Sequence, residues 1–375
     1  MTVARWAPPA VVLVLAPFVF LAVVGALPGD QGFVDLNVYR AGGLLWRTGQ
    51  PLYDGQFPRI LVDQTLVFTY PPLSAMLFAP VSLLTMTAAK VLVTVLSIAA
   101  IAVTVLVVGR ERGLSVTAML ALGAVVVVFE PFRQNFVFGQ VNTVLMALVV
   151  ADCLLPRTWW PRGLLVGLAA AIKLTPAVFV LYFVARRQWR DAAVSVVSGL
   201  GFAGLVALLD PHDSARYWTH TLWDSGRIGE LPYAYNQSMN AVLYRLGLAD
   251  GPRTVLWGLL CVVVVGLGYL AARRAEDKLT ALLVVAVVGL LCSPVSWSHH
   301  WVWIIAAVPL LLAWHRGWGV VVLLVFVVGP HGLMPNLHYA ELNWSWWQHL
   351  TGDAYVWIGL AFLLVTGLRK PSTKL

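Results

Sequence analysis

The stretch VLVTVLSIAAIAVTVLVV, residues 91–108, carries no charged side chain and is nearly long enough to cross the hydrocarbon core of a bilayer as a helix. A second apolar run, LLVVAVVGLL, follows at residues 282–291. Of the 375 residues, 60% are hydrophobic and 11% are charged, and one apolar run after another requires lipid rather than a soluble core. The sequence therefore predicts an all-α polytopic membrane protein, because helices satisfy their own backbone groups in lipid.

About twelve predominantly apolar segments qualify as membrane spans. They lie near residues 9–27, 71–86, 88–109, 115–129, 138–155, 163–185, 191–209, 254–272, 279–293, 301–314, 318–330 and 354–368. If both termini are cytoplasmic, the basic clusters at 186–190, 273–278 and 369–374 all face the cytoplasm, as the positive-inside rule requires. The polar loops 28–70, 210–253, 294–300 and 331–353 then lie outside. The arginines near 110 and 160 disagree, so the topology of residues 71–162 stays open, with 71–86 or 130–140 as re-entrant segments.

The remaining composition argues for a membrane protein without a second domain or cofactor. No repeat or linker is visible, so we expect a single domain over residues 1–375. The net charge of +8 is spread over short loops and belongs to topology, so nucleic acid is not an expected partner. Cys153, Cys261 and Cys292 lie in or beside apolar segments, which predicts no disulfide framework and no metal site.

Asp35 is the first candidate for chemistry. It lies in the polar stretch QGFVDLNVYRAGGLLWRTGQPLYDGQF (31–57), directly after the first apolar span, with Arg40 nearby. A carboxylate close to the outer membrane surface is placed to act as a general base on a lipid-borne substrate. The alternative is an ordinary solvated loop acid, since loops are usually polar.

The stretch SPVSWSHH (293–300) is a polar interruption between two apolar spans. His299, His300 and the indole of Trp297 offer several hydrogen-bond donors, which suits a phosphate group. Adjacent histidines point to different faces of a helix, so a metal site is disfavoured there. Ordinary helix capping at the membrane surface is the alternative.

Lys173, in the span AAAIKLTPAVFVLYFV (169–184), is the third candidate. A lysine at that depth is costly unless it faces an aqueous cavity or binds an anion, and Pro176 loosens the helix beside it. Snorkelling to the membrane surface is the alternative.

Several uncharged polar residues are weaker candidates for a substrate cavity. They are Tyr70 in FTYPPL, Gln140 and Asn142 in FRQNFVFGQVN, and Asn236, Gln237 and Ser238 in YNQSMN. Each set can equally serve helix starts and inter-helix hydrogen bonds. The stretch GLGFAG (199–204) matches a dinucleotide-binding pattern, but it lies inside an apolar span and predicts helix packing instead.

Taken in order, VDLNVYRAGGLLWRTGQPLYDG (34–55), FTYPPL (68–73), FGQVNTVLMAL (138–148), IKLTPAVF (172–179) and SPVSWSHHWVW (293–303) give the chain a recognisable pattern. With these motifs, the chain resembles glycosyltransferase family 87, the polyprenol-phosphate-mannose-dependent mannosyltransferases. Within that family, it is most similar to the α-1,2-mannosyltransferases that extend phosphatidylinositol mannosides.

The resemblance implies a GT-C fold with short outer-face loops and helices. It implies a polyprenyl-phosphate mannose donor, a lipid-anchored mannoside acceptor and an active site on the outer face of the plasma membrane. It also implies that Asp35 is the catalytic base, that His299 and His300 lie at the donor phosphate and sugar, and that Lys173 lies in the same cavity. Trp297 and Arg40 complete the expected donor site, and no cofactor or metal ion is expected.

Two other classes of function stay open on the sequence. A flippase for a lipid-linked sugar would use Lys173 and Asp35 as substrate-binding charges, although the chain shows no matching halves. A scaffold subunit of an envelope-synthesis complex would leave Asp35 replaceable. Relatives that act on lipomannan or arabinan are a further alternative for the acceptor.

Overall fold

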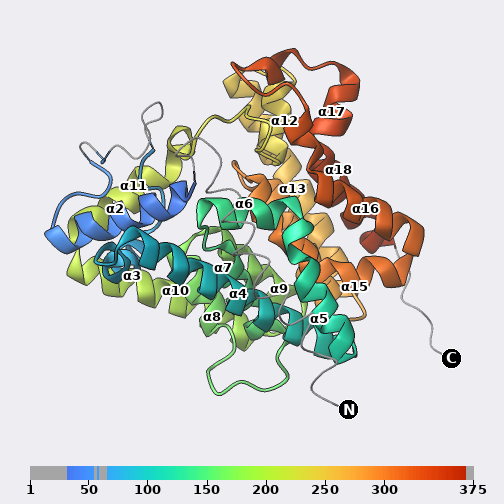
Figure 1. Ribbon diagram of the computed structural model, residues 1–375, viewed down its shortest axis with the longest axis horizontal. Helices are drawn as coiled ribbons and strands as arrows, with labels where there is room; N and C mark the ends of the chain where they lie inside the picture. Colours follow the sequence, from blue (N-terminus) through green and yellow to red (C-terminus); the bar gives the residue numbers. More distant parts are fainter. Residues whose placement is uncertain (1–31, 55–56, 59–65, 369–375) are drawn as a thin grey trace. The chain divides into compact units, whose positions relative to one another are not determined.

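The computed structural model describes residues 32–54, 57–58 and 66–368, and within these ranges the chain is helical and forms no β-strand (Figure 1). The predicted all-helical class is thus confirmed. The predicted first span near 9–27 lies outside the described residues. In this part of the chain, three helices are long and apolar enough to cross a membrane, namely α4 (Met86–Glu111), α10 (Trp189–Leu209) and α13 (Asp250–Arg274). Two bent pairs raise that number to five if each pair counts as one span.

The two bent pairs fall where the sequence places polar residues. In the first pair, α5 (Val116–Ala124) and η2 (Val125–Val128) meet α6 (Glu130–Phe138) at 68°. In the second, α17 (Trp346–Gly352) meets α18 (Ala354–Leu368) at 71°. The remaining apolar helices are shorter than a full span. They are α3 (Pro72–Ser82), α7 (Asn142–Leu154), η3 with α9 (Thr175–Ala185), α14 (Lys278–Cys292), η6 with α15 (Ser298–Trp314) and α16 (Arg316–Val328).

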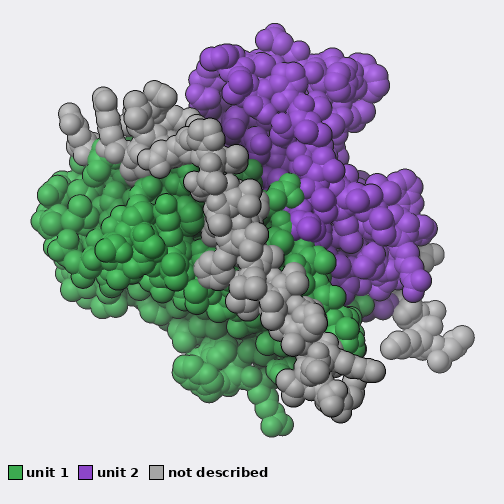
Figure 2. Space-filling model, in the orientation of Figure 1, with its two compact units in different colours: residues 1–127, 132–177, 193–229 green, residues 128–131, 178–192, 230–375 purple. Residues whose placement is uncertain are grey.

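Two compact units, each discontinuous in sequence, make up the chain (Figure 2). Unit 1 comprises residues 1–127, 132–177 and 193–229, and unit 2 comprises residues 128–131, 178–192 and 230–375. Unit 1 contains α2 (Val34–Thr48), α8 (Leu164–Ile172) and α11 (Pro211–Thr219), and unit 2 contains α12 (Met239–Arg245). The expectation of a single domain over the whole chain stays a prediction.

Polar side chains cap the first turns of α4 and α14, and apolar side chains are exposed along the long helices. The Thr85 side chain accepts a hydrogen bond from the amide of Ala88 at the start of α4, and Asp277 does the same for Thr280 at the start of α14. Such caps satisfy amides that have no partner inside the helix. Large apolar residues are exposed along α4, α10 and α13, for example Leu96, Leu200 and Val262. These exposed faces suit contact with lipid.

Glycines set the closest helix contacts in unit 1. A Cβ atom on Gly43 of α2 would lie 2.4 Å from the carbonyl oxygen of Phe78, so α2 and α3 can pack at this distance only through glycine. A Cβ atom on Gly167 of α8 would lie 2.6 Å from the carbonyl oxygen of Ser195 in α10. Gly199, the first glycine of the GLGFAG stretch, packs against the Gly167 backbone, which confirms the predicted packing role at that position.

The helix that contains Lys173 is interrupted at that residue. α8 ends at Ile172, and Lys173 follows with extended backbone angles before η3 (Thr175–Phe179) begins. Pro176 lacks an amide hydrogen and disfavours helix just before it, so the break follows from the sequence IKLTP. The side chain of Lys173 therefore leaves the chain at a helix end rather than from the middle of a helix.

We expect Gly167→Ala to lower the melting temperature in detergent, because the added methyl group must push α8 away from α10. Overpacking of this kind costs about 1–3 kcal/mol. Gly201→Ala is the matched control, since its Cβ would meet nothing within 4 Å. The control should be neutral or slightly stabilising, as alanine favours helix over glycine. Equal melting temperatures for the two variants would contradict the close α8–α10 contact.

Candidate functional site

Asp35 lies in the first turn of α2, a helix that is not among the candidate membrane spans. The helix begins after Phe33, which takes a left-handed backbone conformation, and the positive end of a helix favours a carboxylate in its first turn. Leu36, Val38 and Tyr39 on the same helix are buried. Asp35 itself is part-buried, so its carboxylate is held against unit 1 without being sealed off from solvent.

Four of the predicted polar residues gather around Asp35 in unit 1. Gln140 forms a side-chain hydrogen bond with Asp35, and the charge of Lys173 acts on the same carboxylate. The Lys173 ammonium donates to the side-chain oxygen of Asn142 at 2.9 Å and lies 5.4 Å from the ring centroid of Tyr70. Residues more than a hundred positions apart in the sequence thus form one polar cluster, which we call the Asp35 cluster.

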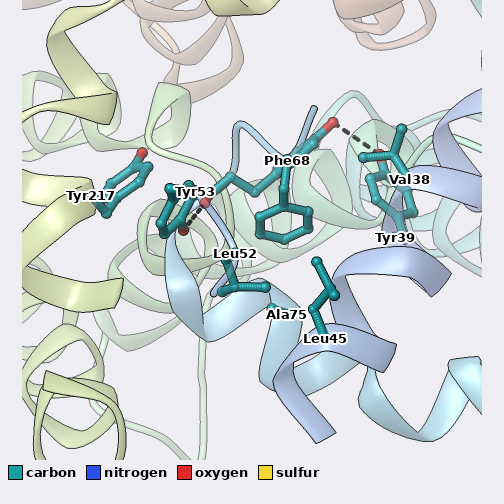
Figure 3. Packing of buried hydrophobic residues seen from close by; sticks show 9 residues of the cluster. Val38, Tyr39, Leu45, Leu52, Tyr53, Phe68, Ala75 and Tyr217 are labelled. Atoms are coloured by element: carbon teal, nitrogen blue, oxygen red, sulfur yellow. Dashed lines mark hydrogen bonds between the residues drawn. The ribbon is translucent and has the colours of Figure 1, made fainter. Parts of the chain in front are cut away.

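Tyr39 belongs to the Asp35 cluster and was not predicted. Its hydroxyl donates to the side-chain oxygen of Gln140 at 2.8 Å and lies 3.0 Å from the hydroxyl of Tyr70. The Tyr39 ring stacks on Phe78 with centroids 4.3 Å apart. Figure 3 shows Tyr39 beside the apolar residues that enclose this side of unit 1, including Val38 and Phe68. The tyrosines therefore join an apolar core to the polar cluster.

Glycine 139 allows Gln140 to reach this position. Gly139 has a φ angle of 67°, and a Cβ atom there would lie 2.9 Å from the Cβ of Leu36. A larger residue would be strained in its backbone and would collide with α2. The motif FGQVN therefore places the end of α6 and the start of α7 directly against α2.

Burial raises the pKa of Asp35 to about 6, and the hydrogen bond from Gln140 and the charge of Lys173 limit this rise. The carboxylate is thus mostly ionised at neutral pH and is a stronger base than an exposed aspartate. A carboxylate of this kind, with an adjacent cation and a polar lining, can accept a proton from a hydroxyl group.

Arg40 points to another part of unit 1. Its guanidinium donates to the carbonyl oxygen of Leu84 at 2.7 Å, in the turn between α3 and α4. This contact gives Arg40 a structural role. Its predicted role at a donor phosphate has no support from a contact in unit 1.

His299 and His300 lie in unit 2, at the start of η6 (Ser298–Trp303). His299 is 6% exposed and His300 is part-buried, and their rings meet edge to face with centroids 4.8 Å apart. Trp297 precedes them and contacts the ring of Tyr233. The two imidazole rings therefore lie against each other, which the sequence did not predict, since adjacent histidines on a helix point to different faces.

A buried carboxylate that the sequence reasoning missed holds the start of η6. Glu130 accepts hydrogen bonds from the hydroxyl of Ser298 at 2.6 Å and from that of Tyr355 at 2.9 Å. The ring of His331 lies 3.4 Å from the same carboxylate. Glu130 is 4% exposed. The sequence could have indicated Glu130, because a single acidic residue between two apolar spans is costly unless it has partners.

Asn236, Gln237 and Ser238 are fully buried in unit 2 and bond to its backbone. Asn236 accepts a hydrogen bond from the amide of Ser296, and Gln237 donates to the carbonyl oxygens of Ala234 and Gly352. Ser238 donates to the carbonyl oxygen of Pro294. These contacts join the YNQS segment to the SPVSWS segment, so the three residues have a structural role, and their predicted place in a substrate cavity stays a prediction.

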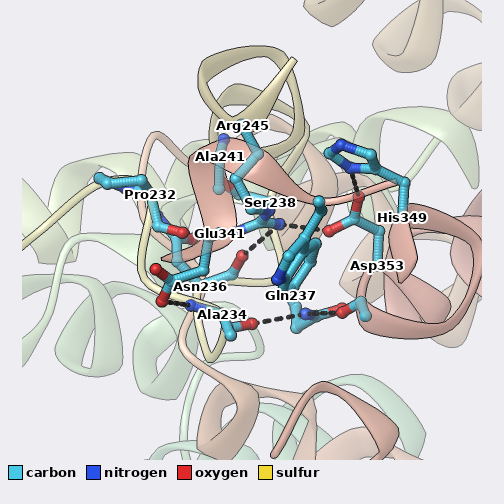
Figure 4. Close-up of polar contacts among 12 residues, drawn as sticks. Pro232, Ala234, Asn236, Gln237, Ser238, Ala241, Arg245, Glu341, His349 and Asp353 are labelled. Atoms are coloured by element: carbon cyan, nitrogen blue, oxygen red, sulfur yellow. Dashed lines mark hydrogen bonds and ion pairs between the residues drawn. The ribbon is translucent and has the colours of Figure 1, made fainter. Parts of the chain in front are cut away.

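A buried ion pair lies beside the YNQS segment, as Figure 4 shows. The guanidinium of Arg245 lies 2.5 Å from the carboxylate of Asp353, and both side chains are fully buried. Arg245 also donates to the carbonyl oxygens of Pro232 and Asn236, and Asp353 contacts His349. The sequence did not indicate this ion pair, because Arg245 and Asp353 are 108 positions apart.

Among the described residues, no group of three or more His, Cys, Asp or Glu side chains could hold a metal ion. The three cysteines, all within the described ranges, form no disulfide bond with one another. Two groups of described residues match the sequence candidates for chemistry: the Asp35 cluster in unit 1, and Trp297, His299 and His300 in unit 2, which we call the histidine segment.

Comparison with known proteins adds a family to this geometry. The sequence profile described as glycosyltransferase family 87 matches residues 68–294. A protein of Mycolicibacterium smegmatis named "Polyprenol-phosphate-mannose-dependent alpha-(1-2)-phosphatidylinositol mannoside mannosyltransferase" is 42% identical, over 90% of this chain and 84% of that protein. A protein of Mycobacterium tuberculosis with the same name is 39% identical, over 89% and 84%.

A second group of relatives is more distant. A Mycolicibacterium smegmatis protein named "Polyprenol-phosphate-mannose-dependent alpha-(1-2)-phosphatidylinositol pentamannoside mannosyltransferase" is 34% identical, over 89% of this chain and 78% of that protein. No solved structure matches the chain significantly.

We expect Asp35→Asn to stabilise the protein at about pH 7.5 by about 1–3 kcal/mol. The raised pKa means that the folded protein resists ionisation of Asp35, and this cost is fully present above about pH 6. As the pH falls from about 6 towards 4, the folded protein takes up the proton and the advantage of asparagine disappears. Melting temperatures in detergent at about pH 7.5 and about pH 4.5 measure the difference.

Asp54→Asn is the control for this experiment. Asp54 is half-exposed and forms an ion pair with Arg216, so its loss should destabilise the protein slightly, by at most about 1 kcal/mol. A lower melting temperature for Asp35→Asn than for wild type at neutral pH would contradict the inference that ionised Asp35 destabilises the folded protein.

Proposed function

Because the chain belongs to glycosyltransferase family 87, we propose that it transfers mannose from polyprenyl-phosphate mannose to a mannosylated phosphatidylinositol lipid and forms an α-1,2 linkage. The printed names of the 42% and 39% identical relatives support the donor and the acceptor class. The observation that carries the proposal is the Asp35 cluster, where a part-buried carboxylate meets Lys173 and Gln140.

The proposed reaction proceeds with inversion in a single step. The acceptor 2-hydroxyl attacks C1 of a β-linked mannosyl phosphodiester, and the new O–C1 bond forms as the bond from C1 to the phosphate oxygen breaks. The hydroxyl proton passes to the base, and polyprenyl phosphate leaves with the bonding electron pair. One base and positive groups at the leaving phosphate are sufficient for this chemistry.

We assign the base to Asp35. Its raised pKa makes it a better proton acceptor, and Gln140 fixes the carboxylate from one side. Lys173, held by Asn142, supplies a positive charge that keeps Asp35 ionised and can face the departing phosphate. Tyr70 lines the same cluster.

We assign the departing phosphate to His299 and His300, with Trp297 beside them. The support is their chemistry, since two imidazoles can donate hydrogen bonds to a phosphate and carry charge. The hydrogen bond from Ser298 to Glu130 and the contacts of the YNQS segment fix the backbone that presents them. This arrangement favours a preorganised anion site over a loose surface loop.

We further propose a GT-C fold with about twelve spans, both termini in the cytoplasm and the active site on the outer face of the plasma membrane. An even number of spans puts both termini on the same side. The basic clusters at 186–190 and 273–278 support this orientation. A lipid-borne donor is consistent with a site at the outer surface. The membrane lipids are the remaining partners.

We expect Asp35→Asn to lower the rate of mannose transfer by about 100-fold or more, because asparagine cannot accept the proton. The assay uses purified protein, polyprenyl-phosphate mannose and a mannosylated phosphatidylinositol acceptor, with mass spectrometry of the glycolipid product. Asp250→Asn, measured in parallel, should stay close to wild type, because Asp250 is exposed at the start of α13. Transfer by Asp35→Asn within a few-fold of wild type would remove Asp35 from the role of base.

The histidine variants test the phosphate site in the same assay. We expect His299→Ala and His300→Ala each to lower transfer by about 10- to 100-fold, since a charge-assisted hydrogen bond contributes about 1.5–3 kcal/mol. Glutamine at either position should rescue only part of the loss. His212→Ala is the control, because His212 is exposed on unit 1. Unchanged donor kinetics with a lower melting temperature would show helix capping instead.

A further inference from the structure

An open pocket of about 520 Å³ lies in unit 1, formed by the end of α11 and by the short helices η4 (Thr221–Trp223) and η5 (Ser225–Ile228). Its volume falls within the range of small-molecule sites. None of its lining residues belongs to the Asp35 cluster or to the histidine segment. The pocket is therefore a separate feature whose chemistry can be derived from its own side chains.

Trp223 gives the pocket an aromatic platform. Its side chain is 75% exposed, and its indole nitrogen donates to the carbonyl oxygen of Trp218 at 3.0 Å. That hydrogen bond limits rotation of the ring, so the exposed surface is preformed. An aromatic face of this kind packs against the C–H groups of a pyranose ring, which has one apolar and one polar aspect.

The polar lining combines donors and acceptors. Arg216 and Arg227 donate, Asp224 accepts, and the hydroxyl of Thr221 can do both. The hydroxyl of Thr219 donates to the carbonyl oxygen of Ala215 at 2.7 Å and can accept. This mixture matches the vicinal hydroxyl groups of a sugar, each of which donates and accepts.

The charges around the pocket balance. Arg216 lies 2.6 Å from the carboxylate of Asp54, and the lining contains Arg227 together with Asp224. The two arginines are therefore matched by two aspartates, Asp224 in the lining and Asp54 beside it, and the remaining ionisable group of the lining, the imidazole of His220, carries no charge in its neutral form. A site for a phosphate or an anionic headgroup needs an excess of positive charge, so the balance favours a neutral ligand.

Tyr53 connects the pocket to the Asp35 cluster within the same unit. The Arg227 guanidinium donates to the carbonyl oxygen of Tyr53 at 3.4 Å, and the Tyr53 hydroxyl donates to the carbonyl oxygen of Tyr70 at 2.6 Å. Figure 3 shows Tyr53 between Tyr217 of α11 and Phe68. One tyrosine thus spans the interval between the two sites.

We propose that this pocket is a subsite for the neutral oligomannoside of the acceptor, and that it binds sugar residues that precede the one whose hydroxyl reacts. The inference rests on the proposed function, because it takes the reacting hydroxyl to lie at Asp35. The pocket then gives the enzyme a preference for acceptors that already carry several mannose residues.

The test compares a long and a short acceptor in wild type and Trp223→Ala. The long acceptor is an alkyl glycoside of α-linked mannotetraose, and the short one is an alkyl α-mannoside with a single sugar. We expect Trp223→Ala to raise the KM of the long acceptor by about tenfold, as loss of one aromatic contact allows, and to leave both constants of the short acceptor unchanged. Trp159→Ala is the matched control, because Trp159 is 93% exposed elsewhere in unit 1.

Binding without donor separates this inference from the proposed function. Free mannotetraose and methyl α-mannoside are titrated against each protein in lipid nanodiscs, with heat of binding as the readout. Mannotetraose binding that depends on Trp223 supports the subsite even if wild type transfers no mannose. If transfer is normal and the ratio of KM for the long acceptor to KM for the short acceptor is the same in wild type and Trp223→Ala, the subsite alone is overturned. The subsite is also overturned if Trp223→Ala weakens binding of mannotetraose and of methyl α-mannoside equally. The same holds if the loss of binding depends on the anionic lipid content of the nanodiscs.

Discussion

A polar group that leaves water must find a partner, and this constraint explains where the ionisable residues of this chain lie. Arg245 and Asp353 are both fully buried and lie 2.5 Å apart. Glu130 accepts two hydroxyl hydrogen bonds deep in unit 2. Each pair joins segments that are far apart in the sequence. Removing one partner would leave a buried charge, so these contacts fix the backbone around them.

Asp35 departs from this pattern in a way that suits catalysis. Its hydrogen bond to Gln140 and the charge of Lys173 do not fully offset the cost of its burial, so the carboxylate keeps a raised pKa near 6. A group that is fully neutralised by partners is a poor base, whereas one that is incompletely compensated accepts a proton more readily. Asp35 lies at the start of α2, a helix that is not among the candidate membrane spans, and its side chain is part-buried.

Close packing in unit 1 depends on a few small residues. Gly43 brings α2 onto α3, and Gly139 brings the start of α7 against Leu36 of α2. Since Asp35 lies on α2 and Gln140 follows Gly139, the same close contacts that build the core also place the two polar side chains together. The motifs RAGG and FGQ are thus explained by geometry as well as by chemistry.

The sequence by itself determined the helical class, the family and the candidate residues, because hydropathy and short motifs are local properties of the chain. It identified Lys173 from its cost in an apolar span, the adjacent histidines from a polar interruption between two spans, and Asp35 from its place in a polar stretch directly after the first span. Only the tertiary structure decided which of them meet. Gln140 and Tyr39 join Asp35, while Arg40 turns to the carbonyl of Leu84. A partner in a folded chain is chosen by helix packing and distance in space, and neither is written in the spacing along the sequence.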